Sequence, residues 1–89
     1  MIKTTTTISN KLGLHARATA KLVALATTFR STIKLTKGSR TVDAKNMMGV
    51  LMLGAGKGTT LGLVIDGDDA DAAHQAIVAL FNRRFDEGE

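Results

Sequence analysis

A histidine followed two residues later by an arginine is the part of this sequence best suited to chemistry. His15 and Arg17 lie in the run Gly13-Leu14-His15-Ala16-Arg17, directly before an apolar pattern typical of a helix. The first backbone N–H groups of a helix lack partners within it, and the helix dipole places partial positive charge there. An anion is stabilised at such a place, and the planar guanidinium of Arg17 suits phosphate oxygens.

A histidine at a helix start has a specific chemical use. Imidazole changes its charge near neutral pH, and a local positive potential favours its neutral form. The neutral ring keeps a lone pair on one nitrogen and can act as a nucleophile at cellular pH. A phosphoryl group on His15 would then lie against the helix N-terminus and Arg17. The plain alternative is a histidine that only caps the helix or covers the surface, and position alone does not exclude it.

The rest of the pattern predicts one domain, residues 1–89, with the element order β-α-β-β-α-β-α. Strands are expected near residues 2–8, 32–36, 40–43 and 59–66, and helices near 16–28, near 47–53, and from the acidic turn at 66–69 to Arg83 and Arg84. Two parallel strands joined through a helix, with a later strand inserted between them, form the split β-α-β arrangement. We expect an α/β fold, an open-faced β-sandwich in which a four-stranded antiparallel sheet carries three helices on one face.

Composition and charge narrow the function classes. The net charge of +4 suits anionic partners in general, but the only aromatic residues are three phenylalanines, which poorly supply a base-stacking surface for nucleic acid. No apolar run approaches the ~20 residues of a membrane helix, and the first residues lack the apolar stretch of a signal peptide. The absence of cysteine excludes disulfides and thiolate metal sites. We expect a cytoplasmic protein with no metal and no cofactor.

Three other features are better explained without a ligand. His74 has no cysteine nearby and no second histidine at i+4, so a helix-surface residue is favoured over a metal ligand. The glycine-rich run at 54–60 lacks the Gly-Lys-Ser/Thr order of a P-loop, because Lys57 is followed by Gly58. The carboxylates at 66–71 stand where acidic residues favour a helix start.

The run Asn10-Lys11-Leu12-Gly13-Leu14-His15-Ala16-Arg17 resembles the active-site motif of HPr, the histidine-containing phosphocarrier of the bacterial phosphoenolpyruvate-dependent sugar phosphotransferase system. Further matches follow at Ala44-Lys45, Met48-Gly49-Val50, Met52-Leu53 and Gly56-Lys57-Gly58. Length and element order agree as well, so the resemblance covers the whole chain.

The resemblance implies a covalent phosphohistidine relay rather than an enzyme. His15 would accept a phosphoryl group on Nδ1 from the phosphohistidine of enzyme I and donate it to sugar-specific enzyme IIA proteins. Arg17 and the backbone N–H groups of Ala16 and Arg17 would support that group. The resemblance further implies a monomer with transient protein partners, no nucleic acid and no insertion into a membrane.

Docking of these partners would use an apolar patch beside the first helix. The patch comprises Met47, Met48, Leu51 and Met52, next to Ala20 and Lys21. Methionine suits a surface that must fit several partners in turn. Helix-spaced core is the plain alternative for about half of the four patch residues.

Two positions depart from the usual HPr pattern. Ala18 stands where most relatives have proline, a change that the first turn of a helix tolerates. Asn46 stands where many HPr proteins carry a serine that a dedicated kinase phosphorylates. An amide has no hydroxyl to accept phosphate, so we expect no regulatory phosphoserine at position 46.

Two alternative functions stay open at this point. One is the carrier of the nitrogen-related phosphotransferase branch, which is chiefly regulatory. The ending at 79–86 is somewhat like that branch, whereas Met48-Gly49-Val50 is more like the sugar system. The other is a basic nucleic-acid-binding domain of ferredoxin-like topology, against which the missing strand aromatics argue.

Overall fold

The computed structural model describes residues 1–87, and its elements follow the predicted order. The strands are β1 (Ile2–Thr7), β2 (Thr32–Lys37), β3 (Arg40–Asp43) and β4 (Thr60–Asp66). The helices are α1 (Ala16–Ala26), α2 (Met47–Leu51) and α3 (Ala70–Asn82). A short turn of 3-10 type, η1 (Arg84–Asp86), follows α3, and the sequence pattern does not predict it.

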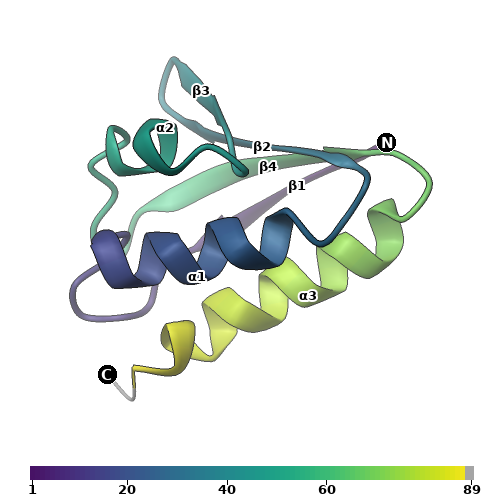
Figure 1. The fold of residues 1–89 in the computed structure, drawn as a ribbon. Coiled ribbons are helices and arrows are strands. Elements are labelled where there is room, and N and C mark those ends of the chain that lie inside the picture. Colours follow the sequence, from purple (N-terminus) through teal and green to yellow (C-terminus); the bar gives the residue numbers. More distant parts are fainter. Residues whose placement is uncertain (88–89) are drawn as a thin grey trace.

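One antiparallel sheet holds the strands in the order β1-β4-β2-β3. In β4, Ile65 pairs with Ile2 of β1 on one side and with Ile33 of β2 on the other. β1 and β2 therefore run parallel with a later strand between them, which is the split β-α-β arrangement. Figure 1 shows α1 and α3 side by side across one face of the sheet, with α2 near β3. The predicted fold class is confirmed.

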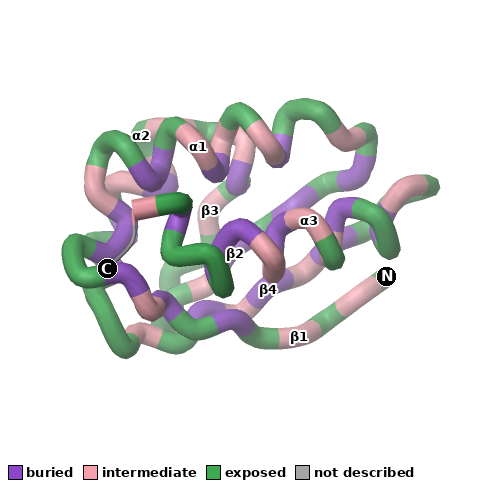
Figure 2. The backbone as a smooth tube through the Cα atoms, turned by 90° about the horizontal axis from the view of Figure 1, so that it is seen from below, coloured by how far each residue is buried: buried purple, intermediate pink, exposed green. Residues whose placement is uncertain are grey.

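Alternating apolar residues build the core between the sheet and the helices. Leu61, Leu63 and Ile65 of β4 are fully buried, whereas the residues between them are only partly so. The predicted face of α3 is buried as well, and it comprises Ala73, Ile77, Leu80 and Phe81. Figure 2 shows the same alternation of buried and exposed positions along α1 and α3. Each large apolar side chain stabilises the fold by about 1.5–3 kcal/mol, and the buried face of α1 holds that helix against the core.

The loop before α1 is braced by the glycine-rich segment at 54–58. Leu14 N–H donates to the Ala55 carbonyl at 2.9 Å. Gly13 has a φ of +66°, and a Cβ there would lie 2.5 Å from the Ala55 oxygen and 2.7 Å from the Gly56 Cα. Only glycine fits this position, because both the backbone conformation and the space exclude a side chain. The segment is the loop that the sequence predicts, and its role in the fold is to support the residues leading to His15.

Asp69 acts differently from the helix cap that the sequence predicts. It stands at the N-cap position of α3, but its side chain makes no hydrogen bond to that helix. The carboxylate instead accepts from Ser31 Oγ at 2.6 Å and from the backbone N–H groups of Arg30 and Ser31 at 2.8 and 2.9 Å. The hydrogen bond from the Ser31 hydroxyl and that from Arg30 N–H lower the pKa of Asp69 to about 2. Asp69 thus ties the connection between α1 and β2 to the start of α3, and the capping prediction is wrong for this side chain.

Gly13→Ala should destabilise the fold more than the same change in an open turn. The left-handed φ and the two backbone clashes predict a loss of about 2–4 kcal/mol in the free energy of unfolding. Gly38→Ala is the matched control, because Gly38 has a φ of +60° but nothing within 4 Å of an added Cβ. It should cost only about 1 kcal/mol. Urea denaturation measures the free energy of unfolding of both variants. Equal losses would contradict the claim that the segment at 54–58 supports the loop before α1.

Asp69→Asn should lower the melting temperature by an amount that depends on pH. The pKa of Asp69 is lowered in the folded protein, so the stabilisation by its carboxylate is present above the ordinary value of 3.8. It is lost as the pH falls through about 2. The difference in melting temperature between the wild type and Asp69→Asn should therefore hold from pH 7 to pH 5 and shrink below pH 4. A difference that stays constant down to pH 2 would refute this assignment.

Candidate active site around His15

His15 is the N-cap residue of α1. Its backbone is extended, with φ −76° and ψ −179°, and its carbonyl accepts the first helical hydrogen bond from Thr19 N–H at 2.9 Å. The ring makes no side-chain hydrogen bond to the helix. Its side chain is 27% exposed. The ring therefore does not cap the helix through a hydrogen bond, and it is partly open to solvent.

The start of α1 offers hydrogen-bond donors to an anion. The N–H groups of Ala16, Arg17 and Ala18 have no carbonyl partner among residues 1–87, as the geometry of a helix start requires. The first turn contains no acidic residue. The Arg17 side chain is exposed and makes no hydrogen bond or ion pair within the described chain. The predicted cluster of His15, Ala16 and Arg17 thus lies together, with its donors uncommitted.

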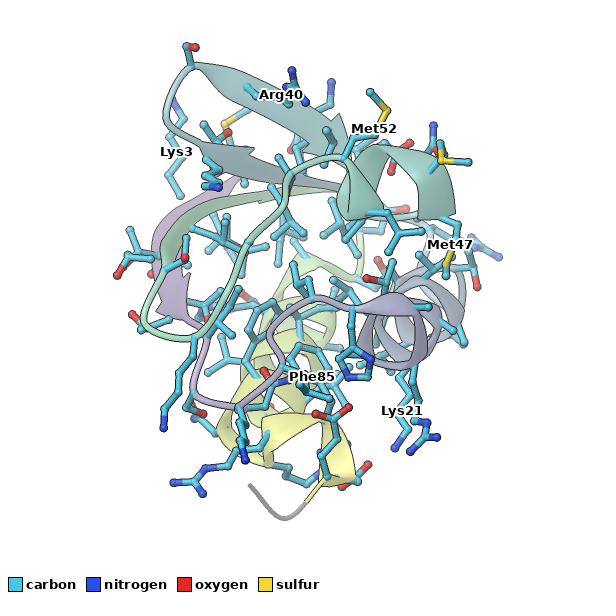
Figure 3. The ribbon with its side chains drawn as sticks, turned by 90° about the vertical axis from the view of Figure 1, so that its left-hand side faces the viewer. Lys3, Lys21, Arg40, Met47, Met52 and Phe85 are labelled. Atoms are coloured by element: carbon cyan, nitrogen blue, oxygen red, sulfur yellow. The ribbon has the colours of Figure 1, made fainter. Side chains whose placement is uncertain are left out.

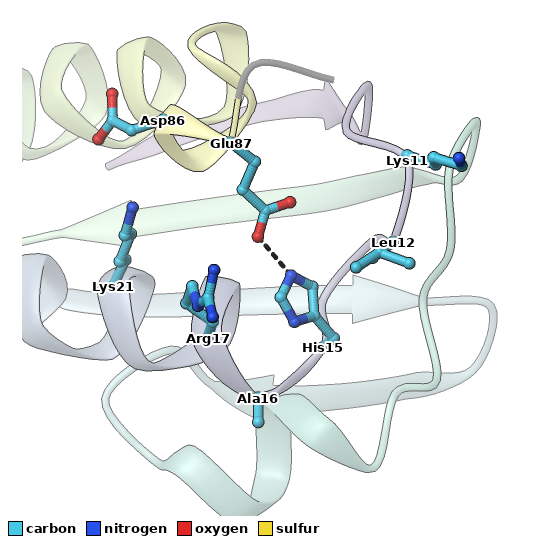
Figure 4. Close-up of a pocket in the computed structure, with 8 residues that line it drawn as sticks. All are labelled: Lys11, Leu12, His15, Ala16, Arg17, Lys21, Asp86 and Glu87. Atoms are coloured by element: carbon cyan, nitrogen blue, oxygen red, sulfur yellow. Dashed lines mark hydrogen bonds and ion pairs between the residues drawn. The ribbon is translucent and has the colours of Figure 1, made fainter.

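A cavity of about 580 Å³ opens beside the His15 ring. Its lining residues are Lys11, Leu12, His15, Ala16, Arg17, Lys21, Asp86 and Glu87. Figure 4 shows the side chains of Arg17 and His15 on the same side of the first turn of α1. Three of the lining side chains are cationic and two, Asp86 and Glu87, are carboxylates. The part of the cavity that favours an anionic group is therefore the start of α1, where the guanidinium of Arg17 and the backbone N–H groups of the first turn lie.

Sequence reasoning missed the carboxylate of Glu87, which contacts the ring. Its Oε2 pairs with Nε2 of His15, and its Oε1 accepts from Asn10 Nδ2 at 2.9 Å. Asn10 is fully buried, and its Nδ2 also donates to the Gly13 carbonyl at 2.8 Å. No local pattern marks Glu87. The one signal in the sequence is an apolar residue beyond the helix end, Phe85, which indicates that the chain returns to the core.

The turn after α3 brings Glu87 to the site. Arg84, Phe85 and Asp86 have φ values of 56°, 54° and 62°, a left-handed conformation that costs about 1 kcal/mol or more at each such residue. The burial of Phe85 offsets this cost, because its ring is fully buried and packs edge-on against Phe81 with centroids 4.9 Å apart. Lys21 Nζ adds a hydrogen bond to the Phe85 carbonyl at 2.7 Å.

The pKa of Glu87 lies below its ordinary value. Burial of the carboxylate acts in the opposite direction and is the largest single influence. The hydrogen bonds from Asn10 and His15 and the charges of His15 and Lys21 together outweigh it. Glu87 is therefore ionised at neutral pH.

The predicted apolar patch lies on α2 and directly after it. Met48 and Met52 are 64% and 61% exposed, and Met47 and Leu51 are half-buried. None of the four is a core residue, because Val50 is the buried residue of this helix. The alternative that half of them form core is therefore wrong. Ala20 is exposed on α1, which packs against α2.

The structure separates Lys21 from this patch. Figure 3 shows Met47 and Met52 on one side of α1 and Lys21 on the other. The Lys21 ammonium is directed to the turn after α3 through its bond to the Phe85 carbonyl. The predicted grouping therefore holds for the four apolar residues but not for the lysine.

Asn46 is the N-cap residue of α2 and caps it through its side chain. Its Oδ1 accepts from Gly49 N–H at 3.1 Å. At the other end of the helix, Arg40 donates to the Met52 carbonyl at 2.9 Å and Lys37 donates to the Leu53 carbonyl at 3.0 Å. The absence of phosphorylation at position 46 stays a prediction, which mass spectrometry after incubation with an HPr kinase tests.

Other ligand sites do not emerge from residues 1–87. This part of the chain holds no group of three or more histidine, cysteine or acidic side chains that could bind a metal ion. His74 is half-buried on α3, where the sequence predicts a helix-surface residue. None of the helices in the described residues is long and apolar enough to cross a membrane.

Comparisons with a family model, with known sequences and with solved structures all match phosphocarrier proteins. The family model described as PTS HPr component phosphorylation site matches residues 2–83. The phosphocarrier protein HPr of Cupriavidus necator is 54% identical over 89 residues, covering 100% of both chains. The phosphocarrier protein NPr of Shewanella violacea is 49% identical over 81 residues, covering 91% of this chain and 89% of the relative.

A solved structure agrees with the fold. The crystal structure of HPr-C-His from Thermoanaerobacter tengcongensis matches with a TM-score of 0.94 and 40% sequence identity, covering 98% of both chains. The resemblance in sequence and the arrangement of strands and helices thus lead to one conclusion. This chain belongs to the HPr family of phosphocarrier proteins of the phosphotransferase system.

Proposed function

We propose that this protein takes a phosphoryl group onto Nδ1 of His15 from phosphorylated enzyme I and passes it to enzyme IIA proteins of the sugar phosphotransferase system. The observation that carries the proposal is the partly exposed ring of His15 at the open N-terminus of α1. Nδ1 makes no hydrogen bond within residues 1–87, which leaves it available to a donor. In Figure 4 it lies on the side of the ring toward the first turn of α1.

The transfer needs only groups that this chain and its partner supply. The Nδ1 lone pair attacks phosphorus while the P–N bond to the donor imidazole breaks, and the donor ring keeps that electron pair. The N–H groups of Ala16 and Arg17 and the Arg17 guanidinium stabilise the negative charge of the phosphoryl oxygens. Donation to the next protein is the same step in reverse. The proposal includes no metal and no cofactor, and the chain alone turns over no substrate.

The proposed partners dock on the apolar patch beside α1. Met48 and Met52 expose long, flexible side chains that adapt to different surfaces. The patch is small, which suits complexes that form and separate quickly. The proposal also includes a monomer that works in the cytoplasm.

The nitrogen-related branch is the second candidate, because an NPr protein is among the similar relatives. It requires the same chemistry at His15 and differs in the donor and the acceptor. Initial rates of phosphorylation by the enzyme I of each branch decide between the two.

Two variants test the roles proposed for the site. With phosphoenolpyruvate and enzyme I, His15→Ala should take up no acid-labile phosphate, and Arg17→Ala should be phosphorylated roughly ten- to a hundredfold more slowly because one charged donor is lost. His74→Ala is the control for the first variant. Arg30→Ala, at an exposed position in the connection between α1 and β2, is the control for the second.

Both controls should react at the wild-type rate. Phosphate uptake by His15→Ala, or a wild type that takes up none, would refute the proposed function. An unchanged rate for Arg17→Ala would remove only the role given to the guanidinium.

A further inference from the structure

The ionised Glu87 carboxylate constrains which nitrogen of His15 carries the proton. A carboxylate without a proton only accepts hydrogen bonds, so its contact with Nε2 requires a hydrogen on that nitrogen. In a neutral imidazole the other nitrogen, Nδ1, then holds the lone pair. This is the nitrogen toward the first turn of α1 in Figure 4.

We infer that Glu87 is a positioning residue for phosphoryl transfer, which holds the His15 ring in the Nε2–H tautomer with Nδ1 directed to the open N-terminus of α1. The inference rests on the proposed function and adds a residue to it. Glu87 contacts the ring from the side opposite to the proposed reacting nitrogen, so it acts through the histidine and not on the phosphoryl group.

Glu87 is held firmly enough for this role. The buried Phe85 anchors the turn two residues earlier, and the Lys21 ammonium binds its carbonyl. Glu87 N–H donates to the Arg84 carbonyl at 3.1 Å. The two carboxylate oxygens are engaged by different partners, His15 and the fully buried Asn10, and the carboxylate side chain is only 13% exposed. A group fixed on both oxygens has little freedom to leave the ring.

The same contact stabilises the charge that the reaction creates. When the neutral Nδ1 bonds to phosphorus and the donor keeps its electron pair, no proton leaves His15, so the imidazole ring gains a positive charge. That charge is shared with the Nε2–H group, which points at the Glu87 carboxylate. An oriented carboxylate behind a reacting histidine acts in this way in hydrolytic triads. Glu87 therefore favours both the correct tautomer and the phosphorylated ring.

Full-length variants at position 87 test this inference. Glu87→Gln keeps the size of the side chain but removes its charge, and Glu87→Ala removes the contact. Asp71→Asn is the matched control, because its exposed carboxylate lies in the first turn of α3, at the opposite end of that helix from the turn that carries Glu87. Two quantities are measured: the initial rate of phosphorylation by enzyme I, and the ¹⁵N shifts of the His15 ring nitrogens at a pH where the ring is neutral.

Both Glu87 variants should be phosphorylated about tenfold more slowly, and their ring shifts should report a mixture of tautomers. The wild type and Asp71→Asn should share one rate and one set of shifts, with the proton on Nε2. Rates and shifts equal to those of the wild type would overturn the inference, as would slower transfer with unchanged shifts. Faster transfer would overturn it too and identify Glu87 as a group that blocks the site. Failure of the wild type to take phosphate on His15 is a separate outcome, which refutes the proposed function itself.

Discussion

The unpaired N–H groups at the start of α1 are the feature on which the proposed chemistry depends. The backbone of a helix supplies these donors and a positive dipole end without any charged side chain. They can bind an anion only where no other group occupies them. His15 leaves them open by turning its ring away from a capping position, and the first turn carries no acidic residue. The remaining elements keep this helix end in place. The core holds α1 on the sheet, and the segment at 54–58 supports the loop that leads to His15.

A carrier has to hold a phosphoryl group and also release it. Donors on a partly exposed helix end and a surface arginine without a partner among residues 1–87 meet both needs, because they stabilise the anion without enclosing it. The two sides of α1 then have different tasks. The turn after α3 approaches one side through Lys21 and reaches the histidine through Glu87, whereas the methionine patch lies on the other. A partner on the proposed docking patch would therefore approach α1 from the side away from Lys21.

Local features of the chain could be predicted from the sequence, and long-range contacts could not. The strand order, the helix that begins after His15 and the cap by Asn46 follow from periodicity and from residues close in sequence. Glu87 lies 72 positions from His15, and its approach depends on three consecutive left-handed residues that no propensity favours. Asp69 looked like a helix cap because its position fits one, but Ser31 and Arg30 hold its carboxylate across the fold. Lys21 likewise sits on the helix as predicted, and its direction depends on a carbonyl that only the folded chain brings near.

Amide spectra of the wild type before and after phosphorylation test the central claim most directly. If the open end of α1 receives the phosphoryl group, the largest downfield proton shifts should occur at the N–H groups of Ala16 and Arg17, which gain a charged acceptor. Small changes at these two amides, with the largest changes elsewhere in the protein, would contradict the claim that the helix start holds the group.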